Sequence, residues 1–282
     1  MIQLNNLSFG YNKKKLLYKN LSLDLNAGSI YGLLGKNGAG KSTFLKNLIG
    51  LLFPIKGSVT VNGYKPGERL PSFLETIYFI PEEVHVPSLT IHQYKNLFSP
   101  FYPNFNEVNF FDYLEQLDVK EQGKLNTLSF GQQKKFIIAF ALACNTKILL
   151  LDEPTNGLDI PSKIRFRKLI SSVFTDDRLI FISTHQIRDL DNLIDRVIII
   201  DNGDLLLDAS IPEVSEKLCF KTVSEIKDMD RVLYQEDSLK GVTIVIENTT
   251  NEDSKVNLEH LFNSITENPE RAKLIFKKHR DE

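Results

Sequence analysis

Residues 35–43, Gly-Lys-Asn-Gly-Ala-Gly-Lys-Ser-Thr, carry the strongest chemical signal in the sequence. They match the phosphate-binding pattern G-x-x-x-x-G-K-[ST], in which glycines let the backbone curl so that several N–H groups point at one anion. Lys41 adds a positive charge that can reach the terminal phosphates, and the Ser42 hydroxyl is placed to hold Mg²⁺. An apolar strand is expected at 29–34 and a helix at 41–51, so the N-terminus of the helix faces the same anion.

Two neighbouring carboxylates, Asp152 and Glu153, end a second apolar run at 148–151. In open parallel sheets, ligands bind beyond the carboxyl ends of the strands. Asp152 at such an end can hold Mg²⁺ directly or through water, and Glu153 can polarise an attacking water as a general base. Solvated acids before a turn are the ordinary alternative, but the complete phosphate-binding loop favours the functional interpretation.

Three further signals are less specific. Ser129 and Gly131 precede an expected helix and could form a second anion-binding N-terminus, or Ser129 could be a simple N-cap; spacing alone leaves both open. His185 follows an apolar run at 179–182, at the edge predicted for Asp152, where it can contact a terminal phosphate or the attacking water. Tyr11 could stack on a base, although an isolated surface tyrosine more often only packs.

The elements that must position these side chains follow from hydrophobic periodicity. The first 30 residues alternate apolar and polar side chains, which indicates half-buried strands, and prolines across 66–110 favour short elements. Between 131 and 209, strands that are apolar on both faces alternate with helices, which predicts a parallel sheet covered on both sides. The helices of this region are expected at 136–143, 161–173 and 186–194.

The character of the sequence changes after Pro212. A helix is expected at 213–227, strands at 231–236 and 242–247, and an amphipathic helix at 256–266. We interpret 213–282 as a small α+β appendage. Its last ten residues are highly charged, and we expect them to be frayed.

Composition bounds the function further. The 282 residues are 42% hydrophobic and 25% charged with a net charge of −2, so nothing suggests the basic surface of a general nucleic-acid binder. Two cysteines, Cys144 and Cys219, do not make a disulfide framework and fit a reducing compartment. Because neither a long apolar run nor a signal-peptide pattern is present, we expect the chain to stay in the cytosol unless a partner holds it at a membrane.

Taken together and in this order, the motifs resemble those of the ATP-binding-cassette (ABC) ATPases over about 1–212. Residues 35–43 resemble the Walker A loop, 128–132 the LSGGQ signature, 148–153 Walker B with its catalytic glutamate, and 156–159 the D-loop. The resemblance implies catalytic roles for Lys41, Glu153 and His185, magnesium contacts from Ser42, Glu82 and Asp152, and nucleotide contacts from Tyr11, Gly35, Asn37, Gly38, Ala39, Gly40, Lys41, Ser42, Thr43, Ser129, Gly131, Gln132 and Asp159.

The sequence departs from the family pattern at two positions. Phe130 stands in the signature where the family usually has glycine, which makes that loop bulkier while Ser129 and Gly131 are kept. Glu82 replaces the usual glutamine of the Q-loop, and its carboxylate can still reach Mg²⁺ directly or through water. A Pro81-Glu82 version of this loop is similar to that of ABC-2-type exporters, the branch that we favour.

The resemblance implies an α/β P-loop NTPase cassette over 1–212, with a mostly parallel sheet, an antiparallel β subdomain and a helical subdomain at about 84–145, followed by the α+β appendage at 213–282. It implies ATP and Mg²⁺ as cofactors. The expected partners are a second copy or a related cassette, facing head to tail, and a separate transmembrane permease that holds the chain at the inner face of the cell membrane.

The leading hypothesis is therefore the ATP-hydrolysing subunit of an ABC exporter, driven by closure and opening of the dimer. The alternative is the ATPase of a non-transport ABC machine, in iron–sulfur assembly or cell-wall remodelling, which the Glu82 loop modestly disfavours. The translation-factor and DNA-repair ABC proteins usually carry two cassettes or long insertions and basic surfaces, so one cassette with a net charge of −2 disfavours them too.

Overall fold

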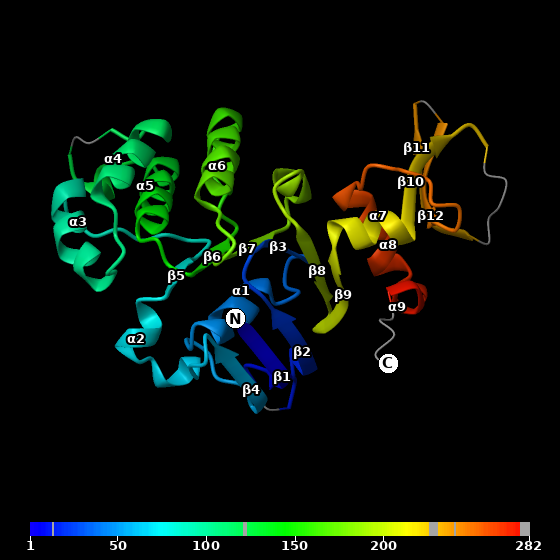
Figure 1. Ribbon diagram of the computed structural model, residues 1–282, viewed down its shortest axis with the longest axis horizontal. Helices are drawn as coiled ribbons and strands as arrows, with labels where there is room; N and C mark the ends of the chain where they lie inside the picture. The colour runs from blue at the N-terminus through cyan, green and yellow to red at the C-terminus, as the bar shows by residue number, and fades with distance from the viewer. Residues whose placement is uncertain (13, 121–122, 226–230, 240, 277–282) are drawn as a thin grey trace. The chain divides into compact units, whose positions relative to one another are not determined.

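The fold is seen in a computed structural model that describes residues 1–12, 14–120, 123–225, 231–239 and 241–276 (Figure 1). The chain divides into two compact units. Unit 1 comprises Met1–Ile30 and Lys41–Thr184, and unit 2 comprises Tyr31–Gly40 and His185–Glu282.

Unit 1 contains an antiparallel sheet in the order β2-β1-β4. The alternation expected in the first 30 residues is present: Leu4 lies opposite Leu23 and Val59, and all three side chains are buried on one face. The strands are β1 (Ile2–Phe9), β2 (Tyr18–Leu25) and β4 (Lys56–Val61).

Unit 1 also contains three adjacent parallel strands that carry the predicted acids, and β6 and β7 are buried throughout. The first helix, α1 (Lys41–Leu48), packs against β6 and β7, where Phe44 stacks on Phe181 with ring centroids 5.7 Å apart. The parallel pairing expected from the apolar runs is thus confirmed. The other elements are β5 (Ile77–Ile80), β6 (Ile148–Asp152), α6 (Ile160–Val173) and β7 (Leu179–Thr184).

Helices α3, α4 and α5 of unit 1 cluster together around aromatic side chains (Figure 1). Phe140 is the centre of this cluster, with ring centroids 5.1 Å from Tyr94, 5.3 Å from Phe105 and 5.8 Å from Phe110. Short elements dominate here, as the prolines predict. The helical elements between β4 and β6 are η1 (Pro66–Glu68), α2 (Pro71–Leu74), α3 (Ile91–Phe98), η2 (Ser99–Phe101), α4 (Glu107–Gln116), η3 (Leu125–Thr127) and α5 (Phe130–Ala143), which is the longest of them.

In unit 2, β3 pairs in parallel with β8, and β8 pairs with the antiparallel strand β9. Strand β3 leads directly into the phosphate-binding loop. Asn202 and Gly203 both have positive φ, of 49° and 84°, and form the tight turn between β8 and β9. The strands are β3 (Ser29–Leu34, from Tyr31 onward in this unit), β8 (Arg196–Asp201) and β9 (Asp204–Ser210).

A second sheet of unit 2 has the antiparallel order β10-β12-β11. Helix α8 packs against β11 and β12, and it also touches β8 and β9. The α+β character expected after Pro212 is present, while the domain boundary there stays a prediction. The elements are α7 (Ile211–Lys217), β10 (Leu218–Val223), β11 (Val232–Ser238), β12 (Gly241–Glu247), α8 (Leu258–Glu267) and α9 (Pro269–Phe276).

Two predicted helices are wrong. The helix expected at 186–194 is only a single 3₁₀ turn, η4 (Ile187–Leu190), and Asn192 follows it with a φ of 59°, in the left-handed region that ends helices. The helix expected at 213–227 ends at Lys217, because the next residues pair with β12 as β10, and residues 226 and 227 of that prediction lie outside the described residues. Of the charged end at 273–282, residues to Phe276 belong to α9 and 277–282 lie outside the described residues. Within the described ranges, every helix falls short of the length and apolar character that a membrane crossing requires.

Candidate functional site

The backbone of the phosphate-binding loop depends on its glycines. Gly38 and Gly40 have φ values of 82° and 104°, which side chains with a Cβ rarely adopt, and the Ala39 N–H donates to the Lys36 carbonyl at 3.1 Å. A Cβ added at Gly38 would meet nothing within 4 Å. The curled loop therefore has open space beside Gly38, and Lys41 continues it as the first residue of α1.

Lys41 and Glu153, predicted to serve catalysis, meet inside unit 1. The Lys41 Nζ lies 3.6 Å from Glu153 Oε1, and their side chains are only 7% and 5% exposed. The Thr184 hydroxyl donates to the other oxygen of Glu153 at 3.0 Å, and the Glu153 N–H donates to the Ser183 carbonyl at 3.0 Å. These contacts hold both carboxylate oxygens and the backbone of Glu153.

The backbone of Glu153 is also strained, because its φ of 46° lies in the left-handed region. A non-glycine residue there costs about 1–3 kcal/mol and persists only where its surroundings fix it. Such strain is concentrated at functional sites, so it is a second reason to place chemistry at this side chain.

Asp152 is buried beside Glu153. The Ser183 hydroxyl donates to Asp152 Oδ1 at 2.5 Å, since the parallel pairing of β6 and β7 places these two residues side by side. Ser42, half-buried in the first turn of α1, offers a hydroxyl. The described residues contain no cluster of three or more His, Cys, Asp or Glu side chains that could hold a metal ion. Mg²⁺ is commonly bound by one or two carboxylates together with substrate phosphates, so the chemistry of these donors fits it.

Sequence reasoning missed the supporting roles of Ser183 and Thr184. Both hydroxyls lie at the end of β7, next to the acids that end β6. A signal was available: two hydroxyl residues at the end of one apolar strand, with two acids at the end of its predicted neighbour.

The start of α5 carries the residues that resemble the signature. The Ser129 side chain accepts the Gln132 N–H at 3.4 Å, so the N-cap alternative is present in the structure, and anion binding there stays a prediction. The Gln132 side-chain amide donates to the Asp118 carbonyl at 3.1 Å. A Cβ on Gly131 would lie 2.9 Å from the Gly157 carbonyl oxygen, so this close approach requires glycine.

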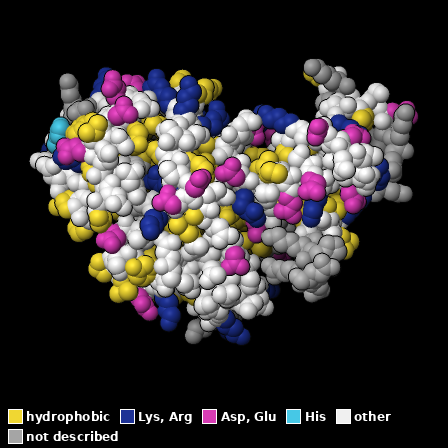
Figure 2. Space-filling view, in the orientation of Figure 1, with side chains coloured by type: hydrophobic (Ala, Val, Ile, Leu, Met, Phe, Trp, Pro, Cys, Tyr) yellow, Lys and Arg dark blue, Asp and Glu magenta, His cyan; other side chains and the backbone are white. Residues whose placement is uncertain are grey.

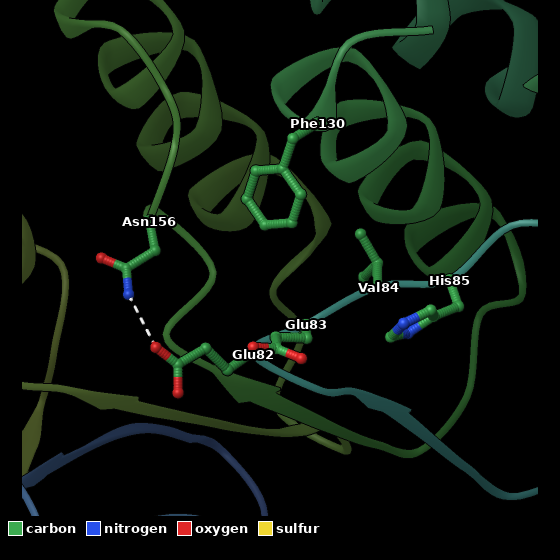
Figure 3. A pocket seen from close by; sticks show the side chains of 6 residues that line it. All are labelled: Glu82, Glu83, Val84, His85, Phe130 and Asn156. Atoms are coloured by element: carbon green, nitrogen blue, oxygen red, sulfur yellow. Dashed lines mark hydrogen bonds between the residues drawn. The ribbon is translucent and has the colours of Figure 1, made fainter. Parts of the chain in front are cut away.

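Phe130 lies against Gly157 and is 46% exposed. A Cβ on Gly157 would come within 2.8 Å of the Phe130 ring, and the Lys134 Nζ lies 5.9 Å from the ring centroid. Phe130 forms one wall of a cavity of about 400 Å³ (Figure 3). The lining residues are Glu82, Glu83, Val84, His85, Phe130 and Asn156.

Glu82 is fixed from two sides. The Asn156 side-chain amide donates to Glu82 Oε1 at 3.0 Å (Figure 3). From the other side, Lys134 Nζ donates to the Glu82 carbonyl at 2.6 Å. Burial lowers the pKa of Lys134, against the opposing effect of the Glu82, Asp152 and Glu153 charges. Magnesium binding by Glu82 stays a prediction.

The remaining predicted residues lie as follows. The Tyr11 hydroxyl hydrogen-bonds to the Thr43 hydroxyl at 2.9 Å, while its ring is 73% exposed. Asp159 caps α6 by accepting the Ser162 N–H at 2.9 Å, and hydrogen bonds from Ser162 hold the pKa of Asp159 below its usual value. His185 is exposed, directly after the end of β7, and begins the second segment of unit 2.

The surface charge is mixed. On the face seen in Figure 2, Lys and Arg side chains are interspersed with Asp and Glu among the described residues, as the net charge of −2 leads one to expect. A stripe of basic side chains of the kind that follows a nucleic-acid backbone is not visible on that face.

The comparisons with known proteins decide the family. The ABC transporter family model matches residues 18–156. An uncharacterized ABC transporter ATP-binding protein of Bacillus subtilis, YdbJ, is 31% identical over 252 residues, covering 84% of this chain and 81% of the relative. The chain belongs to the ABC transporter family. It is an ATP-binding subunit of that family and an ATP hydrolase.

Other family members differ in what their names say. The SkfA peptide export ATP-binding protein SkfE of B. subtilis is 31% identical, covering 77% of this chain and 92% of the relative. The zinc import ATP-binding protein ZnuC of Buchnera aphidicola is 33% identical, covering 71% of this chain and 81% of the relative. The names of these two relatives thus give opposite directions of transport.

Solved structures confirm the fold. An ATP-binding subunit of an ABC transporter aligns with a TM-score of 0.68 at 23% identity, over 76% of this chain and 91% of its own. A dimeric ATP-binding cassette in a post-hydrolysis state, bound to ADP and Pi, aligns with a TM-score of 0.65 at 25% identity. The alignment covers 74% of this chain and 98% of the solved chain. The expected α/β P-loop cassette is therefore correct.

Proposed function

We propose that this member of the ABC transporter family powers an exporter, as the ATP-hydrolysing half of a dimer that a separate membrane protein holds at the inner face of the membrane. The observation that carries the catalytic part is the buried Glu153, whose carboxylate is held by Lys41 and Thr184. The Pro81-Glu82 loop supports the exporter direction.

ATP would bind along the loop and α1. Backbone N–H groups of the loop surround the phosphates, Lys41 exchanges Glu153 for the terminal phosphates, and Tyr11 offers its exposed ring to adenine. Ser42 and Asp152, with Glu82 directly or through water, would hold Mg²⁺, which neutralises charge on the phosphate oxygens. The remaining loop contacts come from Gly35, Asn37, Gly38, Ala39, Gly40 and Thr43.

Glu153 then acts as the general base. It accepts a proton from water as the water oxygen bonds to the terminal phosphorus, and the bond from that phosphorus to the bridging oxygen breaks, so that ADP and phosphate leave. The three contacts of Glu153 hold it in one geometry, since a base must lie within hydrogen-bond reach of the proton it takes. His185 would contact the terminal phosphate or the water.

The second copy would complete the site. The start of α5 exposes Phe130 to solvent, beside the Ser129 and Gly131 backbone, and these residues with Gln132 and Asp159 would face the ATP of the other cassette. ATP then closes the pair, and hydrolysis lets it open.

The test of the dimer uses Glu153→Gln, which keeps the shape of the side chain and removes the base. With ATP and Mg²⁺ the variant should sediment as a dimer at micromolar protein concentration, and as a monomer with ADP. A monomer under both conditions at high protein concentration would show that the paired model is wrong.

The test of export uses the chain isolated from native membranes. Co-isolation with a multi-spanning protein, followed by ATP-dependent loss of substrate from cells or from oriented vesicles, supports export. ATP-dependent accumulation in cells would establish import, the direction named for the zinc relative. Isolation in a complex without a membrane protein would favour a non-transport machine.

A further inference from the structure

The turn that follows His185 is seated on the strand that feeds the phosphate-binding loop. Leu190 and Ile194 are buried, and a Cβ added to Gly32 of β3 would lie 2.9 Å and 2.8 Å from their terminal methyl groups. Gly32 therefore lets η4 and the residues after it approach the β3 backbone. A shift of this turn must move either His185 or the side chains that pack on β3.

The turn is also held from the C-terminal side of unit 2. Helix α8 packs against η4, and the Arg188 Nε donates to Glu259 Oε2 at 2.9 Å. The side chain of Asn257 caps α8 by accepting the N–H groups of Glu259 and His260, both at 3.0 Å. Glu259 is thus held in the first turn of a capped helix, where it meets Arg188 three residues after His185.

Helix α8 connects this turn to the appended sheet. Besides η4 it packs against β8 and β9, and against β11 and β12. Its buried face, with Leu258, Leu261 and Ile265, provides the apolar part of this packing. The position of α8 therefore depends on the β10-β12-β11 sheet, and the position of η4 depends on α8.

We propose that Arg188 and Glu259 are positioning residues for ATP hydrolysis, through which α8 holds the turn that places His185. The inference rests on the proposed contact between His185 and the terminal phosphate or the attacking water. It gives the appended α+β elements a part in the reaction: whatever shifts α8 against η4 changes the rate of hydrolysis.

An exposed ion pair adds little to the stability of a protein, so a change in hydrolysis after charge reversal does not come from unfolding. Arg188→Glu and Glu259→Arg are made singly and together in the full chain. Each single reversal should lower kcat about two- to five-fold, the range expected for an exposed pair, with unchanged KM for ATP and unchanged melting temperature. The double reversal should restore kcat.

The matched control is Lys221→Glu. Lys221 Nζ contacts Glu252 Oε2 at 2.8 Å, an exposed ion pair on the appended sheet. Its reversal should leave kcat at the native value. If the Arg188 and Glu259 reversals leave kcat at the native value too, or if the double reversal does not restore it, the proposal is overturned.

Two further measurements separate this proposal from the proposed function. His185→Ala should abolish hydrolysis while ATP still binds; a native rate in that variant refutes the role of His185 itself. If His185→Ala is inactive but the charge reversals are not impaired, only the positioning role is refuted. In proton NMR, the His185 ring signals, assigned by their loss in His185→Gln, should shift in Arg188→Glu and return in the double reversal. Unshifted signals contradict the proposal.

Discussion

The two regions of unit 1 that are proposed to meet ATP are built in opposite ways. At the end of β6, Asp152 and Glu153 are buried, and their carboxylates are held by Lys41 of α1 and by Ser183 and Thr184 of β7. At the start of α5, Phe130 is half exposed and borders a cavity of about 400 Å³.

This difference indicates a division of labour. A group that moves a proton must be held in one geometry, and burial with fixed partners achieves that. A surface that receives a second molecule must remain open until that molecule arrives. We therefore expect substitutions at the end of β6 to change the rate of the chemical step, and substitutions at the start of α5 to change the dependence on protein concentration.

Among the substitutions that compare these two regions, the largest expected effect is that of Glu153→Gln on hydrolysis. Loss of the general base should lower kcat about 10²- to 10⁴-fold, while ATP affinity stays within about three-fold of the native value. Phosphate release and equilibrium binding of a fluorescent ATP analogue measure the two quantities. If the variant still hydrolyses ATP at a tenth of the native rate, Glu153 is not the general base.

Ser183→Ala tests whether the acids need their hydroxyl partners. It leaves Asp152 without its 2.5 Å hydrogen bond, so we expect a loss of about 1–3 kcal/mol in the free energy of unfolding and a lower kcat. Urea unfolding and steady-state hydrolysis check this. Ser172→Ala is the control, since it removes the hydroxyl of an exposed residue, bonded to the Leu169 carbonyl in α6. Equal losses in the two variants would refute a special role for Ser183.

Phe130→Ala probes the exposed region. Because the ring is half exposed, we expect a loss of about 1 kcal/mol in stability, unchanged ATP binding by the monomer, and a several-fold shift in the protein concentration that gives half-maximal hydrolysis. The control is Phe53→Ala, which truncates another exposed ring of unit 1. A change in monomer ATP affinity, with no change in the concentration dependence, would break the comparison between the two regions.

Glu82→Gln should have the smallest effect. Glutamine keeps an oxygen that can accept from Asn156, so only the negative charge is lost, and we expect kcat to change by about two-fold or less at saturating Mg²⁺. A titration of hydrolysis with Mg²⁺ measures it. If half-maximal activity then requires about ten-fold more Mg²⁺, Glu82 binds the metal directly rather than through its loop contacts.

Much of the fold was accessible from the sequence because its strongest signals are local. Apolar runs such as 148–151 predict buried parallel strands, and the glycines at 38 and 40 predict the curled loop. The acids at the end of β6 were also found, since their position follows from the strand that carries them.

The rest depends on contacts between residues far apart in the sequence. The Glu82–Asn156 hydrogen bond joins ordinary polar side chains 74 residues apart, so the sequence around neither residue predicts it. The helix predicted across 218–223 failed because pairing with β12 outweighs local helical periodicity. The helix predicted at 186–194 is reduced to one turn because Asn192 adopts a left-handed backbone conformation. Hydrophobic periodicity does not reveal that conformation.

The central claim is that a loop with Lys41 binds the phosphates of ATP for attack beside Glu153. Hydrolysis and equilibrium ATP binding, measured on the native chain and on Lys41→Ala, test it most directly. Loss of this cation should weaken binding and lower kcat about 10²- to 10³-fold, as removal of a charge-stabilising donor does in other active sites. Undiminished hydrolysis by Lys41→Ala would contradict the account.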